Sequence, residues 1–155
     1  MADYKKMLQQ LADAYNRGDP DAFAAVFHPE CDWHPVLTRA ENDPGYHGHR
    51  GIRRWFEDVD EMFEYVDLEV YFDDLRQVGD RLLIQGRLHA KGRESGAEVT
   101  SDVGWVAEPR GEKFLRVWGY VSYEDARRAA EEATIEGGAR TSDRMSRSYP
   151  VGLSE

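Results

Sequence analysis

The sequence predicts an α+β fold, with helices early in the chain and an antiparallel sheet late. In the first third of the chain, apolar residues recur at helical spacing. From residue 68 onward, apolar and polar residues alternate as they do in strands. The longest alternating segments, 81–91, 99–108 and 113–121, are separated by short turns. We expect one face of these three strands to line a cavity and the other face to carry exposed aromatic residues.

Composition narrows the classes of function. The chain has 155 residues, which suits one domain with a hydrophobic core, and a formal net charge of −10. That charge disfavours nucleic acid and anionic membrane surfaces as partners, because both need clustered Lys and Arg. No segment reaches the roughly 20 apolar residues of a membrane-spanning helix, and the N-terminus lacks the apolar run of a signal peptide. The single cysteine, Cys31, cannot form an intrachain disulfide, so we expect a cytoplasmic protein.

Three helices are expected before residue 65. The first spans 3–16 and the third about 49–64, and each carries an apolar stripe. Asp19-Pro20 suits the N-cap and first position of a second helix, which His28-Pro29 would end. The apolar positions of the three helices are Tyr4, Met7, Leu8, Leu11, Tyr15, Ala22, Phe23, Val26, Phe27, Ile52, Trp55, Phe56, Val59 and Phe63.

Shorter elements join these segments. Residues 31–34 are expected to form a short strand that Pro35 ends, and 68–73 a further strand. Between them, the polar stretch 36–48 is long enough to act as a lid.

The end of the chain divides into a helix and a tail. Ser122 and Asp125 have the spacing of a capping box, which predicts a final helix over 123–132. Beyond it, Gly, Ser and Arg are frequent and periodicity is lost. We therefore expect one domain over 1–132 and a disordered or loosely attached tail over 133–155.

Strand alternation indicates which side chains face the core. In 81–91 the apolar set should face inward, whereas in 113–121 both sets are apolar, and we place the aliphatic one inward. In 99–108 the pattern is ambiguous, and we place the set that contains Asp102 inward. The inward sets are Leu82, Ile84, Gly86, Leu88 and Ala90; Thr100, Asp102, Gly104 and Val106; and Leu115, Val117, Gly119 and Val121.

The outward set of the last strand suggests a dimer interface. It contains Phe114, Arg116, Trp118 and Tyr120, and aromatic residues with arginine are typical of interface cores. Trp105 would join this surface if its side faces outward.

Three inward positions are glycines, at Gly86, Gly104 and Gly119. A strand glycine often marks the close approach of a ligand, because it has no side chain to fill the space. Three inward glycines would therefore leave a cavity inside the curved sheet. They suit sheet curvature and bulges equally well.

Four segments resemble a known family. They are AYNRGDPDAFAAVFHPECDWHP, YHGHRGIRRWF, GDRLL and GEKFLRVWGYVSYEDA. The chain resembles the SnoaL-like branch of the NTF2-like superfamily over about Met7 to Ala130. The resemblance implies a cone of curved sheet around a long helix, with a pocket at its open end. Because the superfamily includes cyclases, steroid isomerases, epoxide hydrolases, dehydratases and proteins that only bind, it leaves the function open.

The resemblance singles out His34. The segment Asp32-Trp33-His34-Pro35 is similar to the part of ketosteroid isomerase where an aspartate before proline is the general base, and His34 takes that position. An imidazole at the mouth of an apolar pocket suits proton transfer near neutral pH, with Asp102 as its partner. The alternatives are a histidine packed at a strand end and a solvated aspartate.

Other catalytic positions of these relatives are not matched. The oxyanion-hole positions of the isomerase correspond to Leu11 and Gly104, and its supporting tyrosine to Phe56. The catalytic arginine and aspartates of limonene-epoxide hydrolase correspond to Gly86, Leu88 and Gly119. We expect neither mechanism.

Candidate ligand-binding residues come from the helices, the lid and the inward strand faces, although the aromatic ones suit a plain core as well. They are Tyr15, Tyr46, Trp55, Phe56, Leu82, Ile84, Gly86, Leu88, Gly104, Val117 and Gly119. No metal site is expected, because the histidines and Cys31 lack a typical ligand spacing. No cofactor is expected, because the sequence contains neither a P-loop nor a Gly-rich dinucleotide motif.

Three functions remain open. The first is a cyclase- or isomerase-type enzyme that acts on a hydrophobic substrate, with His34 as general acid or base. The second is a non-catalytic binding module with the same pocket. The third is an assembly domain whose homodimer, formed through Phe114, Trp118 and Tyr120, is the function.

Overall fold

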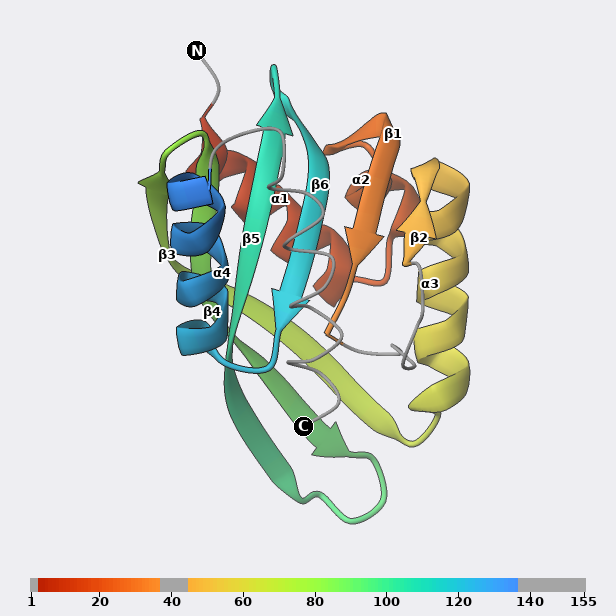
Figure 1. Ribbon diagram of the computed structural model, residues 1–155. Coiled ribbons are helices and arrows are strands. Elements are labelled where there is room, and N and C mark those ends of the chain that lie inside the picture. The colour runs from red at the N-terminus through yellow and green to blue at the C-terminus, as the bar shows by residue number, and fades with distance from the viewer. Residues whose placement is uncertain (1–2, 37–44, 137–155) are drawn as a thin grey trace.

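The computed structural model describes residues 3–36 and 45–136, which form four helices and one six-stranded sheet (Figure 1). The helices are α1 (Tyr4–Asn16), α2 (Pro20–Ala24), α3 (Gly48–Met62) and α4 (Tyr123–Glu136). The strands are β1 (Phe27–His34), β2 (Tyr46–His47), β3 (Val66–Val78), β4 (Arg81–Gly92), β5 (Glu98–Arg110) and β6 (Lys113–Tyr120). The expected α+β class is confirmed.

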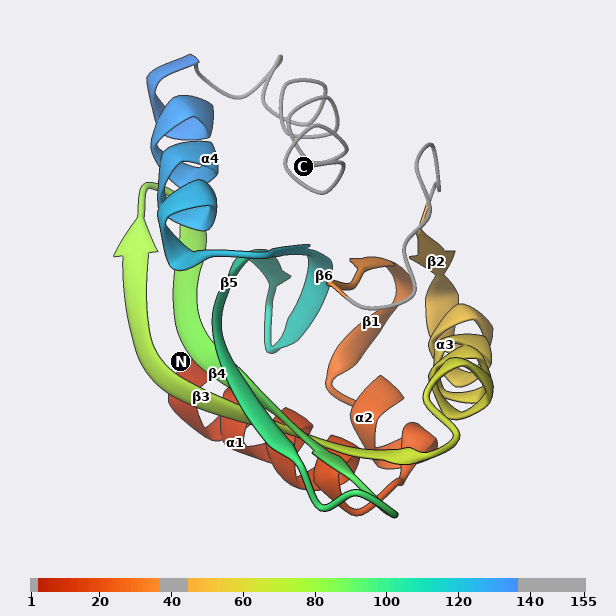
Figure 2. The same cartoon turned by 90° about the horizontal axis from the view of Figure 1, so that it is seen from below.

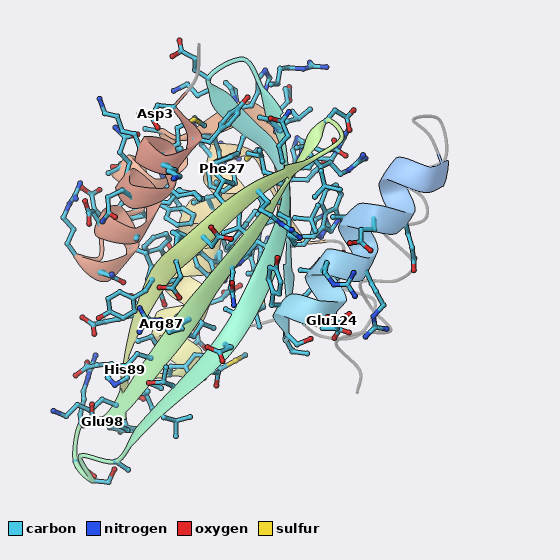
Figure 3. The ribbon with its side chains drawn as sticks, turned by 90° about the vertical axis from the view of Figure 1, so that its left-hand side faces the viewer. Asp3, Phe27, Arg87, His89, Glu98 and Glu124 are labelled. Atoms are coloured by element: carbon cyan, nitrogen blue, oxygen red, sulfur yellow. The ribbon has the colours of Figure 1, made fainter. Side chains whose placement is uncertain are left out.

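The strands follow the order β2-β1-β6-β5-β4-β3 across the sheet. The predicted antiparallel meander is present from β3 to β6. β1 joins it in parallel alongside β6, and β2 forms a short antiparallel edge beyond β1. The sheet curves strongly (Figure 2), and α1 and α4 lie on opposite sides of it (Figure 3). We call the face that packs with α1, α2 and α3 the inner face, and the face that packs with α4 the outer face.

Side-chain caps fix where three helices begin. The carboxylate of Asp3 accepts a hydrogen bond from the backbone N–H of Lys6 at the start of α1. Asp19 does the same for Ala22 in α2, as its sequence predicts. The Ser122 hydroxyl accepts from the N–H of Asp125, 3.1 Å away, at the start of α4.

Some boundaries differ from the sequence-based expectation. α2 ends at Ala24, and β1 already begins at Phe27, so His28-Pro29 lies within a strand. The pairing of β1 with β6 is irregular between Phe27 and Asp32, which accommodates a proline that has no N–H to donate. α4 continues to Glu136, past the predicted end at 132. Most of the predicted lid and the tail beyond residue 136 lie outside the described residues.

The predicted orientation of β5 is wrong. Val103, Trp105 and Ala107 face the inner core, whereas Val106 packs on the outer face with α4. Asp102 and Gly104 alternate with the inner set, so they also face outward. Both faces of this strand are buried at its C-terminal half, and alternation alone therefore could not identify the inner one.

The predicted dimer surface is also wrong. Phe114 is fully buried and packs against Phe27 in the inner core, with ring centroids 6.2 Å apart. Trp118 and Tyr120 do face outward, but both are only 2% exposed and cluster with the alanines of α4. α4 occupies the place that we had expected a second subunit to fill.

One side chain of α1 makes hydrogen bonds to the backbone of the edge strand β3, beside the apolar packing of the two elements. The Asn16 amide donates to the carbonyl of Val70 at 3.0 Å and accepts from its N–H at 2.8 Å. These two hydrogen bonds satisfy a backbone C=O and N–H that would otherwise lack a strand partner at the edge of the sheet. This contact positions the end of α1 over the inner face.

Candidate ligand cavity

A narrow cavity lies between the inner face of the sheet and the first three helices. Its wall consists of Tyr15, Phe23, Trp33, Pro35, Val36, Trp55, Val70, Phe72, Leu88 and Trp105. The centre of a water molecule can occupy only about 40 Å³ of it, which is room for a few waters, although about 380 Å³ is free of atoms when the adjoining open solvent is counted. The lining side chains among the described residues carry no charge, so the cavity suits an apolar molecule.

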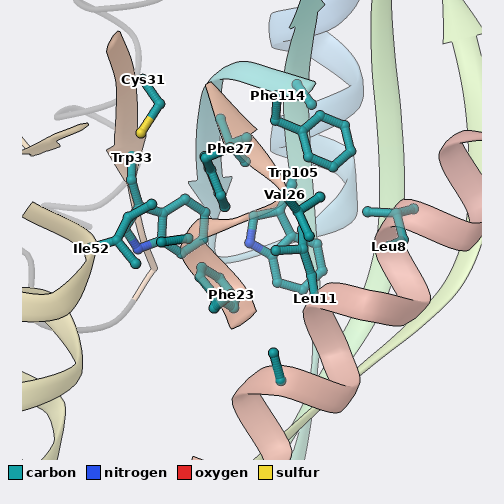
Figure 4. Packing of buried hydrophobic residues seen from close by; sticks show 14 of the residues in the cluster. Leu8, Leu11, Phe23, Val26, Phe27, Cys31, Trp33, Ile52, Trp105 and Phe114 are labelled. Atoms are coloured by element: carbon teal, nitrogen blue, oxygen red, sulfur yellow. The ribbon is translucent and has the colours of Figure 1, made fainter. Parts of the chain in front are cut away.

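Aromatic rings from separate elements converge on this space. Figure 4 shows Phe23, Trp33 and Trp105 meeting in the core from α2, β1 and β5. Trp33 and Trp55 pack edge to face, with ring centroids 5.1 Å apart and planes at 79°. The ring of Tyr15 lies 5.5 Å from that of Trp55. The wall is therefore largely aromatic, and its rings pack on one another at steep or tilted angles.

Trp105 reaches the cavity because a glycine leaves room for it. A Cβ at Gly86 would lie 2.8 Å from Cζ3 of Trp105, closer than real side chains allow. The Trp105 ring thus lies across β4 and meets Phe72 edge to face at 4.9 Å. Gly86 faces inward as predicted, but it makes room for a ring of the wall and does not itself line the cavity.

The other two glycines also adjoin protein atoms. A Cβ at Gly119 would meet Val36, whose side chain takes that space and itself lines the cavity. A Cβ at Gly104 would lie 2.8 Å from the Cβ of Ala126 and 2.9 Å from the Cα of Tyr123, both in α4. The prediction that Gly104 lines the cavity is wrong, because it lies under α4 on the outer face.

The surface of the cavity is apolar, because the polar atoms of its wall residues are turned away or covered. The indole N–H groups of Trp33 and Trp55 are buried and have no hydrogen-bond partner among the described residues. An unpaired buried donor costs about 1–3 kcal/mol. Burial, together with the charge of Asp60, raises the pKa of Tyr15 to about 12, so its phenol stays neutral at physiological pH.

The predicted ligand-binding residues fall into two groups. Tyr15, Trp55 and Leu88 line the cavity. Tyr46 is buried against α3 instead, where its hydroxyl donates to Asp58 at 2.7 Å. The remaining apolar predictions lie in the surrounding core without reaching the wall; they are Phe56, Leu82, Ile84 and Val117.

His34 and Asp102 are not brought together. His34 is the register partner of Trp118, so both side chains share the outer face, and their rings stack with centroids 5.9 Å apart. The backbone of Gly45 packs against the same imidazole. Asp102 is exposed, and it lies four residues along β5 from Val106, the residue opposite Trp118. That offset corresponds to about 13 Å along the strand.

Several wall residues were missed from the sequence. Trp33 is the neighbour of His34, and alternation alone requires one of the two to face inward once the other faces outward. Val70 and Phe72 alternate in β3 and could have been found by the same rule. The sequence pattern predicts the wrong face for Trp105, and it does not distinguish Phe23 from plain core.

The cysteine and histidines do not form a metal centre in the described part of the chain, where no group of three possible ligands occurs. Burial raises the pKa of the Cys31 thiol to about 11, so it stays protonated near neutral pH. Over the same residues, no helix combines the length and apolar character needed to cross a membrane.

A family model described as the SnoaL-like domain matches residues 8–117 of the chain. The chain belongs to the SnoaL-like family. The resemblance seen in the sequence is thereby confirmed. A comparison with curated proteins returns no match.

Solved structures share the fold of this SnoaL-like chain at low sequence identity. An NTF2-like protein of Burkholderia pseudomallei is 14% identical, with a TM-score of 0.63, and the match covers 83% of this chain and 97% of that one. A protein with a ketosteroid isomerase-like fold from Catenulispora acidiphila, in complex with trimethylamine, is 16% identical, with a TM-score of 0.62 and coverage of 75% and 85%. TerC, co-crystallised with polyporic acid, is 18% identical, with a TM-score of 0.63 and coverage of 81% and 96%.

Proposed function

We propose that this SnoaL-like chain is a binding protein for a small apolar molecule. The observation that carries the proposal is the concentration of tryptophan at one place. Three of the four tryptophans of the chain, Trp33, Trp55 and Trp105, line a single cavity together with Tyr15 and other apolar side chains. Large aromatic rings around an apolar cavity favour an apolar ligand that packs against them.

The neighbours in fold support a small-molecule site. Two of the similar structures contain a small molecule, trimethylamine in one and polyporic acid in the other. The family resemblance implies a pocket at the open end of the cone, and the cavity of this chain lies between the curved sheet and the helices.

Binding is better supported than general acid–base catalysis by His34. A general base must come within hydrogen-bond reach of the proton that it moves. The described cavity wall contains neither an imidazole nor a carboxylate, and His34 stacks on Trp118 at the outer face. We therefore expect the His34→Ala variant to retain ligand-induced stabilisation.

The test is a thermal-shift and binding screen with small apolar compounds, from single-ring aromatics upward. A ligand at 100 times its Kd should stabilise the folded state by about 2.7 kcal/mol. Leu88→Trp should fill the cavity and abolish this stabilisation, because Leu88 lies in the wall. Val99→Trp is the matched control, since it adds the same side chain on the neighbouring strand where Val99 is 63% exposed.

Two results would contradict the proposal. One is the absence of any stabilising compound in a broad screen of apolar molecules. The other is an unchanged affinity in the folded Leu88→Trp variant, which would locate the binding elsewhere.

A further inference from the structure

The first half of β5 forms an open edge of the sheet. β6 pairs with β5 only as far as Tyr120, which lies opposite Gly104, whereas β5 begins at Glu98. β5 therefore runs past the end of β6 (Figure 1), and residues 98–103 pair with β4 alone. Every second residue of such a strand directs its N–H and C=O away from its one neighbour. Among the described residues, no backbone group outside β4 bonds to this stretch.

The two outer edges of the sheet are protected against further pairing. β2 offers only two residues. The ladder of the long strand β3 is irregular between Phe72 and Asp74, and the Asn16 amide bonds to both the N–H and the C=O of Val70. Short strands, bulges and side-chain cover are the means by which native sheets prevent association at their edges.

The open half of β5 has none of these protections. Its sequence over 98–103 is EVTSDV, which contains neither Pro nor Lys, and its ladder with β4 is regular throughout. Residues 98–102 are exposed, and Glu98 lies near the tip of the β4–β5 hairpin, away from α4 (Figure 3). Valine and threonine favour the extended backbone of a strand. A regular, uncovered edge of this composition is suited to accept one more strand.

The side chains along this edge define what an added strand would meet. Glu98, Thr100 and Asp102 lie on the outer face, and Val99 and Ser101 lie on the inner face, which continues the alternation of β5 described above. On the outer face, a basic residue opposite either carboxylate stabilises the strand pair, and an acidic residue destabilises it. On the inner face, Val99 is 63% exposed and can pack against an apolar residue.

A second copy of this edge fits poorly. Two copies of 98–102 that pair antiparallel over their full length place Glu98 of one copy opposite Asp102 of the other, at both ends of the ladder. Like charges directly opposite each other are unfavourable. Centring the pair on Ser101 would place Glu98 opposite Gly104, which already pairs with Tyr120. A shift by one residue would bring inner side chains opposite outer ones.

We propose that residues 98–102 bind an extended basic segment of another protein, which joins the sheet as an additional strand. The segment carries Lys or Arg at its first and fifth positions, which face Glu98 and Asp102, and apolar residues at its second and fourth positions. The net charge of −10 favours the approach of such a segment. This edge is separate from the cavity, so the inference does not depend on the proposed function.

The test is a titration of the isotopically labelled full chain with the end-capped peptide Lys-Val-Thr-Val-Lys, followed by NMR of the backbone amides. The peptide has the same side-chain order in both directions, so it suits a parallel and an antiparallel strand alike. The amide shifts of 98–103 should change, with affinity about tenfold higher than for Glu-Val-Thr-Val-Glu at low salt. Added salt should reduce this preference, because the carboxylates are exposed. N-methylation of the three central residues keeps both lysines but removes strand hydrogen bonds, so it should weaken binding strongly.

The variant Asp102→Lys tests the charge assignment. Asp102 is exposed, so the fold should be retained, and reversal of its charge should bring the affinities of the two peptides together. Asp74→Lys is the matched control, because Asp74 is an exposed aspartate on the protected edge strand β3. It changes the net charge by the same amount and should leave the preference for the lysine peptide intact.

Several outcomes would overturn the proposal. Unchanged amide shifts at 98–103 would show that this edge does not bind a strand. Equal affinity for the lysine and glutamate peptides, or loss of the preference in Asp74→Lys, would exclude recognition of a basic segment by these carboxylates. Self-association of the free chain that Val99→Asp abolishes would identify a second copy as the occupant. Much tighter peptide binding after truncation at Glu136 would mean that this chain already covers its own edge.

Discussion

At the scale of single residues, glycines decide how closely the layers of this molecule approach each other. Gly86 lets the ring of Trp105 lie across β4 on the inner face. Gly104 lets α4 rest directly on β5, with Ala126 as the opposing small residue. In both cases the missing side chain is replaced by protein atoms, so these positions are filled parts of the core.

Gly104→Ala should therefore destabilise the fold. The added methyl group would meet Ala126 and the backbone of Tyr123, and it would push α4 away from the sheet. Overpacking of this kind costs about 1–3 kcal/mol, measured as a lower midpoint of urea unfolding.

A double-mutant cycle supplies the control. Ala126→Gly removes the atom that the new methyl group would meet, so it should recover part of the loss caused by Gly104→Ala. Strictly additive effects of the two substitutions would show that the helix contact is not the cause.

At the scale of elements, charged side chains connect neighbouring strands on the outer face. Arg81 of β4 pairs with Glu108 of β5 at 2.6 Å, and Glu108 also pairs with Arg116 of β6 at 2.8 Å. Asp32 of β1 lies 3.6 Å from Arg116 and 3.0 Å from His47 of β2. The short strand β2 is thus tied to the sheet by an ion pair as well as by its two backbone pairs.

The His47 pair gives stability that should depend on pH. The hydrogen bond to Asp32, with the nearby charge of Glu30, holds the pKa of His47 above its usual value. Folding therefore favours the protonated imidazole. The contribution is fully present below the unfolded pKa of about 6.5 and is lost as pH rises through the higher folded value. Because His47 is largely exposed, the effect should be small and weakened by salt.

The measurement is the difference in Tm between wild type and His47→Gln across pH 5.5 to 8.5, a range of about one to two units either side of the unfolded value. We expect the wild type to be more stable than the variant at the acidic end, and the difference to shrink toward the alkaline end. A difference that does not change with pH would refute the assignment.

The sequence predicts the positions of helices and strands well, but it predicts strand orientation and long-range pairing poorly. The caps at Asp19 and Ser122, the stripe of α3 and the short turns identified most helices and strands correctly. The predicted orientation of β5 is wrong because both faces of the strand are buried at its C-terminal half. Hydrophobic alternation identifies the inner face only when the other face is exposed to solvent. The position of His34 depended on which strand lies beside β1, a long-range pairing with β6 that local patterns do not contain.

At the scale of the whole molecule, α4 completes a second, smaller core. Leu83, Val106, Trp118 and Tyr120 are buried on the outer face beside alanines of this helix. The family match ends at residue 117, before this helix begins. Fold class and family could be predicted from the sequence, whereas the role of α4 required the sheet face that it packs against.

Removing α4 should abolish stable folding. Burying a large apolar side chain contributes about 1.5–3 kcal/mol, and four such side chains compare with the roughly 5–15 kcal/mol that stabilise a typical domain. A chain truncated after Val121 is expected to aggregate or to bind a hydrophobic dye, with loss of a cooperative thermal transition. Truncation after Glu136 keeps every contact described above and is the control. If the chain that ends at Val121 were monomeric and unfolded cooperatively, this role for α4 would be wrong.

The parallel pairing of β1 with β6 has a consequence for synthesis on the ribosome. β1 is complete at His34, but its parallel neighbour is finished only at Tyr120. Until then Phe27 and Trp33 lack part of their final surroundings, because Phe114 and Val117 do not yet exist. Closing such a distant contact is entropically slow. The nascent chain must therefore carry an open apolar edge through most of its elongation, and Trp33 on β1 joins the rest of the cavity wall only after β6 has arrived.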